Sequence, residues 1–263
     1  ETTMQVMDEP NRKNTSTSYM WVYRNHRPDK KVVLVDYQET RHAQWPKQIL
    51  NDFKGYLQTD GYKGYDWVND RPDIIHLGCF AHAKRPFAQL VKIAKTTGKS
   101  HQAVAYIQKL YALEKIAREN HYTAQQRYEL RLKKAKPILD ELKIWLDKSL
   151  KTAAPKSKLG DGLVYMVQQW NELTAYLSDG SLEIDNNLIE NLIRPFALGR
   201  KNWMIAGSPR GAQAGALFYS LIATAKANEL NTFDYLKHLF ENIRFCKTSK
   251  DYKALLPSNI KQL

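Results

Sequence analysis

Segments with the composition of β-strands are confined to the first third of the chain, and this asymmetry restricts the fold more than any other feature. Each segment combines β-branched and aromatic residues over a short stretch bounded by turn residues. Four of them are clear and the weakly alternating fifth is at the N-terminus: Tyr19–Arg24, Lys31–Tyr37, Tyr56–Tyr62, Asp73–Cys79 and Thr2–Asp8. Helical segments at Trp45–Gly55 and from Phe80 onward alternate with these strands, a pattern typical of a mixed α/β sheet flanked by helices.

The remainder of the chain has the apolar spacing of helices, with hydrophobic residues three and four apart. From about Ser100 to Leu177 no strand-like segment occurs, which indicates an all-helical insertion. After a turn at Ser178–Ser181 come a further helix, a connection over Ala197–Gly211 and two more helices. We therefore predict an α/β core in two parts, residues 1–97 and 181–228, a helical insertion over 98–180 and a C-terminal helical tail over 229–263.

Charge restricts the class of partner. The chain of 263 residues has a formal net charge of +13 and a sequence pI near 9.5. This balance favours a polyanion such as nucleic acid or an anionic membrane surface. The sequence contains no apolar run of roughly 18 residues and no signal-peptide pattern, so we expect a cytoplasmic protein without a membrane partner. Two cysteines far apart, Cys79 and Cys246, agree with a reducing compartment.

The stretch from Ser181 to Trp203 places many polar side chains on one predicted helix. With Asp185 as N-cap, the residues Asn186, Asn187, Glu190, Asn191 and Arg194 fall within an arc of about 140°. Leu and Ile fill the opposite arc. A solvated face with a Glu190–Arg194 pair is the simpler interpretation. Asn is a poor helix former, however, and such a local cost is more typical of functional sites.

Asp60 is the second notable acid, at the end of a predicted strand and followed by Gly61. An Asp-Gly turn explains the pair equally well. Carboxylates at strand ends are nevertheless well placed to bind a metal, and Gly61 allows a tight turn and a close approach. A strand-end Asp and a distant helical Glu in a basic chain suggest Mg²⁺ and two-metal phosphodiester chemistry.

Four ordered motifs together resemble the IS66 family of transposases: LQTDGYKGY, LGCFAHAKRPF, EIDNNLIENLIRPFALGRKNWMIAGSPRGA and YSLIATAKANEL. The resemblance runs nearly end to end. It implies a DDE transposase with an RNase H-like core whose Asp, Asp and Glu bind two Mg²⁺ or Mn²⁺ ions. By this resemblance Asp60 is the second acid and Glu190 the third, and Asn187, Asn191 and Arg194 line the site.

The resemblance places the family's first Asp immediately before Glu1. The family's N-terminal DNA-binding and zinc-binding regions would precede it as well. We therefore expect this polypeptide by itself to be inactive and the longer protein to be active. Asp36, on the third predicted strand, is not expected to replace the first acid.

Two further groups of residues are candidates for the site. Cys79 and His82 have a C-x-x-H spacing, but zinc requires about four ligands and no second such motif occurs. We expect a structural role, with His82 near the active site or in contact with DNA. Basic residues near the motifs are expected to hold the DNA backbone, although a solvated loop explains some of them: Lys84, Arg85, Arg194, Arg200, Lys201 and Arg210. The basic run Arg127–Pro137 is more typical of a charged helix face.

The reaction implied by the resemblance is nicking of transposon ends followed by transfer of the freed 3′-hydroxyl to target DNA. Partners would be both DNAs, a homo-oligomer on DNA and accessory proteins of the same element, on the nucleoid of a bacterium. Two alternatives remain open. An RNase H-like nuclease would cut without joining, and a non-catalytic DNA-binding module would need only the positive charge.

Overall fold

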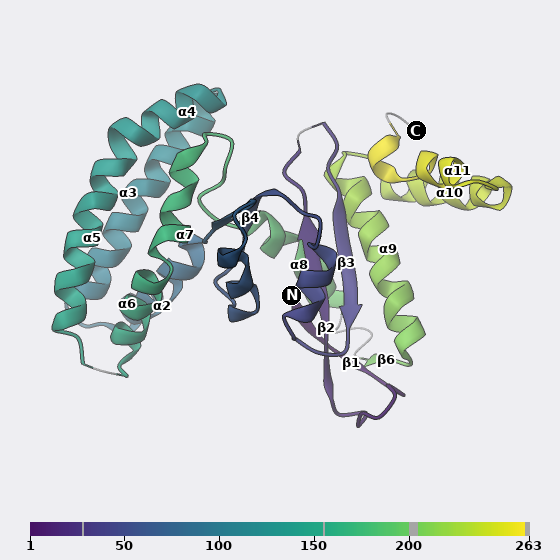
Figure 1. Ribbon diagram of the computed structural model, residues 1–263, viewed down its shortest axis with the longest axis horizontal. Helices are drawn as coiled ribbons and strands as arrows, with labels where there is room; N and C mark the ends of the chain where they lie inside the picture. The colour runs from purple at the N-terminus through teal and green to yellow at the C-terminus, as the bar shows by residue number, and fades with distance from the viewer. Residues whose placement is uncertain (28, 155, 200–204, 261–263) are drawn as a thin grey trace. The chain divides into compact units, whose positions relative to one another are not determined.

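The computed structural model describes residues 1–263 except 28, 155, 200–204 and 261–263 (Figure 1). The chain forms two compact units, which are described separately below. Unit 1 contains Glu1–Trp45 and Leu188–Leu263, and unit 2 contains Pro46–Asn187. Helix α8, Asn187–Gly199, begins at the last residue of unit 2 and continues into unit 1.

Unit 1 is built on a four-stranded sheet of order β3-β2-β1-β6. Its strands are β1 Thr2–Val6, β2 Thr17–Arg24, β3 Val33–Gln38 and the short β6 Ile205–Ala206. The β1–β2 and β2–β3 pairs are antiparallel, whereas β1 and β6 are parallel. Alternate side chains of β1 to β3, such as Met4, Val6, Met20 and Val35, are buried, as period-two alternation requires.

Helix α9, Pro209–Ala227, packs along β3 at the edge of this sheet. Its small residues Ala212 and Ala216 enter the core. Further along, the Val35 amide donates to Ser220 Oγ at 2.8 Å and the Val33 amide donates to Thr224 Oγ1 at 3.0 Å. The hydroxyls of α9 therefore satisfy backbone groups that an edge strand otherwise leaves to solvent or to another chain.

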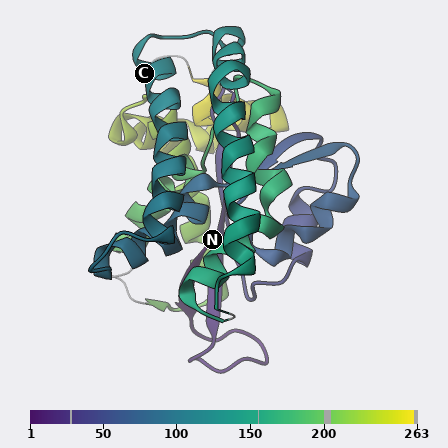
Figure 2. The same ribbon diagram turned by 90° about the vertical axis from the view of Figure 1, so that its left-hand side faces the viewer.

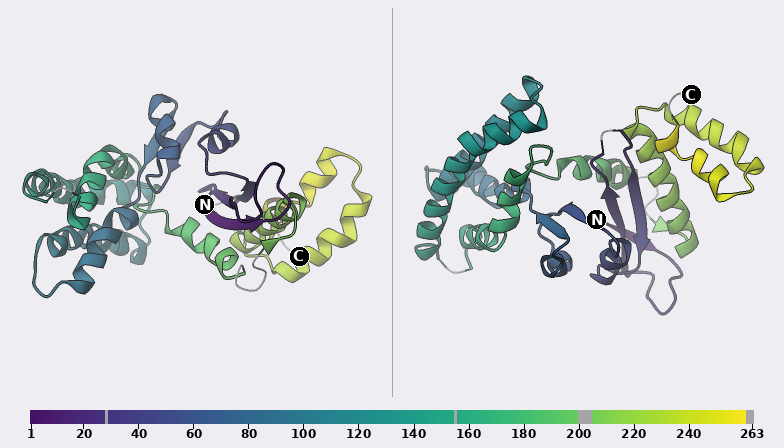
Figure 3. Two further views of the ribbon diagram at one scale, coloured as in Figure 1. Left: turned by 90° about the horizontal axis from the view of Figure 1, so that it is seen from below. Right: turned by 45° about the horizontal axis from the view of Figure 1, so that its top comes forward.

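The C-terminal part of unit 1 consists of α10, Thr232–Asn242, and α11, Ser249–Ala254, beside the end of α9 (Figure 3). A small separate core holds them, with Ala225, Tyr235 and Leu239 buried against Leu221 and Leu255. The Tyr235 hydroxyl also donates to the Leu255 carbonyl at 3.2 Å.

Unit 2 combines a small parallel strand pair with a helical bundle. Strands β4, Gly55–Gln58, and β5, Ile74–Leu77, are joined by a 3-10 helix at Lys63–Asp70. The helices are α2 Phe80–Ile93, α3 Lys99–Glu119, α4 Ala124–Leu130, α5 Lys136–Lys151, α6 Lys158–Gln168 and α7 Trp170–Thr174. A π-helical turn at Arg131–Ala135 connects α4 to α5. Figure 2 shows α3 and α5 running alongside each other over a core that includes Phe80, Phe87 and Ile107.

The mixed α/β class and all five predicted strands are confirmed, with differences at several boundaries. Helix α1, Gln44–Ile49, ends well before the expected Gly55. Strand β4 ends at Gln58, so Asp60 follows the strand after one intervening residue. The short β6 lies inside the segment expected to be a connection, because two residues of parallel pairing leave no periodic pattern in a sequence. The predicted domain boundaries stay a prediction.

Candidate active site

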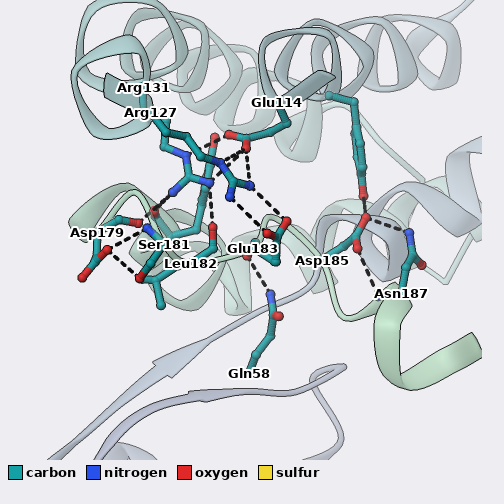
Figure 4. A network of polar contacts seen from close by, with 12 residues as sticks. Gln58, Glu114, Arg127, Arg131, Asp179, Ser181, Leu182, Glu183, Asp185 and Asn187 are labelled. Atoms are coloured by element: carbon teal, nitrogen blue, oxygen red, sulfur yellow. Dashed lines mark hydrogen bonds and ion pairs between the residues drawn. The ribbon is translucent and has the colours of Figure 1, made fainter. Parts of the chain in front are cut away.

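The carboxyl ends of β4 and β5 in unit 2 bring the predicted site motifs of that unit together. Both strands end at the same edge because they are parallel. Asp60 lies just beyond β4 and Cys79 just beyond β5. Gln58 Nε2 donates to the carbonyls of Gly78, at 3.1 Å, and Glu183, at 2.9 Å. The segment that leads into α8 is therefore fixed at this edge (Figure 4).

The backbone around Asp60 is held from two sides. The half-buried carboxylate accepts the Tyr62 amide at Oδ1, at 3.1 Å, which is the turn geometry expected of Asp-Gly. From α6, the Tyr165 hydroxyl donates to the Asp60 carbonyl at 2.8 Å. No hydrogen bond to Oδ2 occurs within the described residues.

Gly61 is required by both conformation and packing. Its φ of +82° lies in the left-handed region that favours glycine. A Cβ at this position would lie 2.8 Å from Tyr165 Oη and 3.0 Å from Gln169 Oε1. The close approach that the sequence suggested is thus present, and the approaching groups are side chains from α6 and the residue that follows it.

The Cys79 thiol contacts both His82 and the segment before α8. The buried Cys79 thiol donates to Asn186 Oδ1 at 2.9 Å, and His82 Nδ1 lies 3.2 Å from the sulfur. Burial raises the pKa of the Cys79 thiol to about 11, so it stays protonated at neutral pH. The thiol thus links α2 to the segment before α8, while the role expected of the pair stays a prediction.

The entry to α8 is shaped by Asp185. The helix begins at Asn187, so its N-cap is Asn186, and Asp185, predicted to be the N-cap, lies one residue earlier. Its carboxylate still accepts the first helical amide, from Asn187 at 3.0 Å, and also accepts the Asn187 side chain at 2.8 Å. The Tyr111 hydroxyl of α3 donates to the same carboxylate at 2.6 Å. Asn187 therefore bonds locally to Asp185, whereas Asn186 bonds to the distant Cys79.

A buried ion-pair network, which the sequence did not predict, fixes the same segment from the side of the helical bundle of unit 2 (Figure 4). Arg131 is 0% exposed and pairs with Glu114, 2% exposed, at 2.8 Å. Arg131 also donates to the carbonyls of Tyr176, Asp179 and Leu182.

Arg127 extends this network. It bridges Glu114 at 2.6 Å and Glu183 at 3.0 Å. The basic run Arg127–Pro137 is therefore only partly a solvated face, because Arg131 is buried and the half-buried Arg127 pairs with two glutamates.

The other predicted residues are distributed over both units. In unit 2, Lys84 Nζ lies 5.7 Å from the centre of the Tyr111 ring and Arg85 is exposed. In unit 1, Glu190 is half-buried on α8, while Asn191, Arg194 and Arg210 are exposed. Arg200 and Lys201 lie outside the described residues. Since Asp60 belongs to unit 2 and Glu190 to unit 1, their convergence stays a prediction.

Comparison with known proteins decides the family. Residues 1–214 match the family model of the transposase IS66 family, and residues 220–258 match the IS66 C-terminal element. The chain belongs to the IS66 transposase family. The family resemblance inferred from the four sequence motifs is therefore confirmed.

Curated relatives of this IS66 family chain occur in Sinorhizobium fredii (strain NBRC 101917 / NGR234). Uncharacterized protein y4jD is 30% identical over 99% of the chain and 53% of its own length. Uncharacterized protein y4qI is also 30% identical, over 99% of the chain and 50% of its length. The chain thus spans about half the length of these relatives. No solved structure matches the chain significantly.

Two properties of the described residues bear on partners and cofactors. None of the helices there is long and apolar enough to cross a lipid bilayer. Within the same residues, His, Cys, Asp and Glu side chains form no group of three or more that could hold a metal ion.

Proposed function

We propose that this chain is the catalytic part of a DDE-type transposase that cuts and joins DNA phosphodiesters on an RNase H-like core. The observation that carries the proposal is the strand edge in unit 2. Asp60 follows β4 there, and Gln58 and Cys79 bind the segment that opens the Glu190-bearing helix at the same edge. The sheet of unit 1 combines antiparallel β1–β3 with the parallel β6, and unit 2 has a separate parallel β4–β5 pair; an RNase H-like arrangement of these strands is part of the proposal.

The donor chemistry of the proposed site fits a hard divalent cation. Mg²⁺ prefers oxygen ligands, commonly one or two carboxylates together with phosphate oxygens. Asp60 presents a half-buried carboxylate whose Oδ2 accepts no hydrogen bond from the described residues, and Glu190 presents a half-buried carboxylate on α8. With the acid implied before Glu1, they would hold two Mg²⁺ or Mn²⁺ ions. Such ions stabilise the attacking and leaving oxygens of an in-line displacement.

The remaining residues of the site would bind and orient DNA. Exposed cations on both units suit the phosphate backbones of transposon ends and target, because phosphate contacts position a duplex without reading its sequence. The exposed ones are Arg85, Arg194 and Arg210; the half-buried Lys84 belongs to the same proposal, as do Arg200 and Lys201, which lie outside the described residues. Asn191 would contact DNA from the exposed side of α8. A homo-oligomer bridging two DNA ends, with accessory proteins of the same element, belongs to this proposal.

Substitution of the two acids tests the proposal. In a longer chain that includes the residue before Glu1, Asp60→Asn and Glu190→Gln should each lower Mg²⁺-dependent cleavage of a labelled transposon end at least about a hundredfold, since each removes a metal ligand. Binding of the same DNA should persist. Glu141→Gln, at an exposed position of α5, is the matched control and should retain cleavage. Undiminished cleavage by Glu190→Gln would remove that residue from the site.

An end-joining assay separates the proposal from its alternatives. A transposase transfers the freed 3′-hydroxyl to a second DNA, whereas a plain nuclease stops after cleavage. A non-catalytic DNA-binding module would neither cut nor join in the presence of Mg²⁺ or Mn²⁺.

A further inference from the structure

Helix α10 of unit 1 leaves a set of large aromatic side chains in solvent. Phe233 is 75% exposed, Phe240 57% and Phe245, just beyond the helix, 63%. The opposite side of the helix carries Tyr235 and Leu239, which are buried in the small C-terminal core. Clustered exposed aromatic residues are typical of protein interfaces rather than of free surfaces.

Charged residues accompany the aromatic residues on this side of the helix. Asp234, Lys237, Glu241 and Arg244 are exposed, and none of the four forms an ion pair within the described residues. At about 100° per residue, the exposed helical positions fall within an arc of about 120°. We name as the α10 face the residues Phe233, Asp234, Lys237, Phe240, Glu241, Arg244 and Phe245.

The order of these residues is self-complementary about Leu239. Lys237 and Glu241 lie at equal distances on either side of it and have opposite charges. The same holds for Asp234 and Arg244, while Phe233 and Phe245 form an equally spaced aromatic pair. The 3-10 turn Ile243–Phe245 directly continues α10, so these positions extend the same helical rod.

We propose that the α10 face binds the same face of a second copy of this chain, antiparallel, about a two-fold axis at the level of Leu239. A two-fold contact brings each position beside its mirror position in the other copy. Lys237 then meets Glu241 of the second copy, Asp234 meets Arg244, and Phe233 meets Phe245.

The aromatic surface continues onto α9, which enlarges the contact. The rings of Phe218 and Phe240 lie 6.3 Å apart at an angle of 44°. Leu217, beside Phe218 on α9, is 59% exposed. The proposal does not depend on catalysis, because it concerns only the surface chemistry of the C-terminal helices.

Charge exchange tests the proposed pairing. Sedimentation equilibrium of this 263-residue chain should show a monomer–dimer equilibrium. Lys237→Glu places two like-charged pairs in the contact, as does Glu241→Lys, so each should weaken dimerisation about tenfold or more. Lys250→Glu on α11 makes the same charge change outside the face and should leave the dimer unchanged.

A mixture gives the decisive result. Combining the Lys237→Glu chain with the Glu241→Lys chain restores opposite charges in both pairs, so a mixed dimer should form where neither variant dimerises well alone. Unchanged circular dichroism verifies that the variants fold. A monomeric native chain, or a dimer that neither substitution weakens, would overturn the proposal and leave this face to another partner.

Discussion

Gly61 lies next to Asp60, and both its backbone conformation and the side chains packed around it restrict which residue fits there. Its positive φ disfavours any residue with a Cβ, and the Tyr165 hydroxyl would lie 2.8 Å from that atom. We expect Gly61→Ala to lower the free energy of unfolding by about 1–3 kcal/mol, from strain and overpacking together. Urea denaturation of purified protein measures this change.

Gly215 supplies the matched control, since it lies within α9 and a Cβ there would meet nothing within 4 Å. Gly215→Ala should be neutral or stabilising by up to about 1 kcal/mol, because alanine favours the helix. Equal stabilities for Gly61→Ala and native protein would contradict the packing described around Asp60.

Residue types and spacing predicted part of this local structure. Asp-Gly chemistry indicated the turn at Asp60, which the Tyr62 amide closes on the Asp60 carboxylate. The partners could not be predicted, because Tyr165 reaches the Asp60 carbonyl across 105 residues and Asn186 reaches Cys79 across 107. Hydrogen bonds of that separation depend on the tertiary fold and leave no periodic signal.

At the scale of elements, the buried network around Arg131 joins α3 and the α4–α5 junction to the segment before α8. Replacement by Arg131→Met leaves Glu114 buried near Arg127 with one of its two guanidinium partners removed. Loss of one partner of a buried ion pair costs about 3–5 kcal/mol, so a clear loss of stability is expected in chemical denaturation.

Lys134→Met, three residues along the same basic run but exposed, is the control and should change the free energy of unfolding by about 0.5 kcal/mol or less. If both substitutions have equally small effects, the network does not stabilise the unit. The spacing of Arg and Lys in this run predicts a charged helix face, because the same helical period occurs whether these side chains are solvated or buried. Only the fold brings Glu114, 17 residues away, against Arg131.

At the scale of the whole molecule, the boundary between the two compact units lies in α8, the helix that carries the proposed metal ligand Glu190. The boundary between units falls within α8, between Asn187 and Leu188, so Asp60 and Glu190 belong to different units. Strand pattern, helical tract and family motifs predicted the α/β class and the family. Periodicity did not predict this division, because it depends on packing between segments that are distant in sequence.

Anomalous diffraction from Mn²⁺-soaked crystals of a longer chain, including the residue before Glu1, tests most directly whether the two acids share a metal site. The account predicts a manganese peak with carboxylate oxygens of both Asp60 and Glu190 about 2 Å from the same or adjacent ions. Manganese bound to neither carboxylate, or the two carboxylates at sites far apart in the crystal, would contradict it.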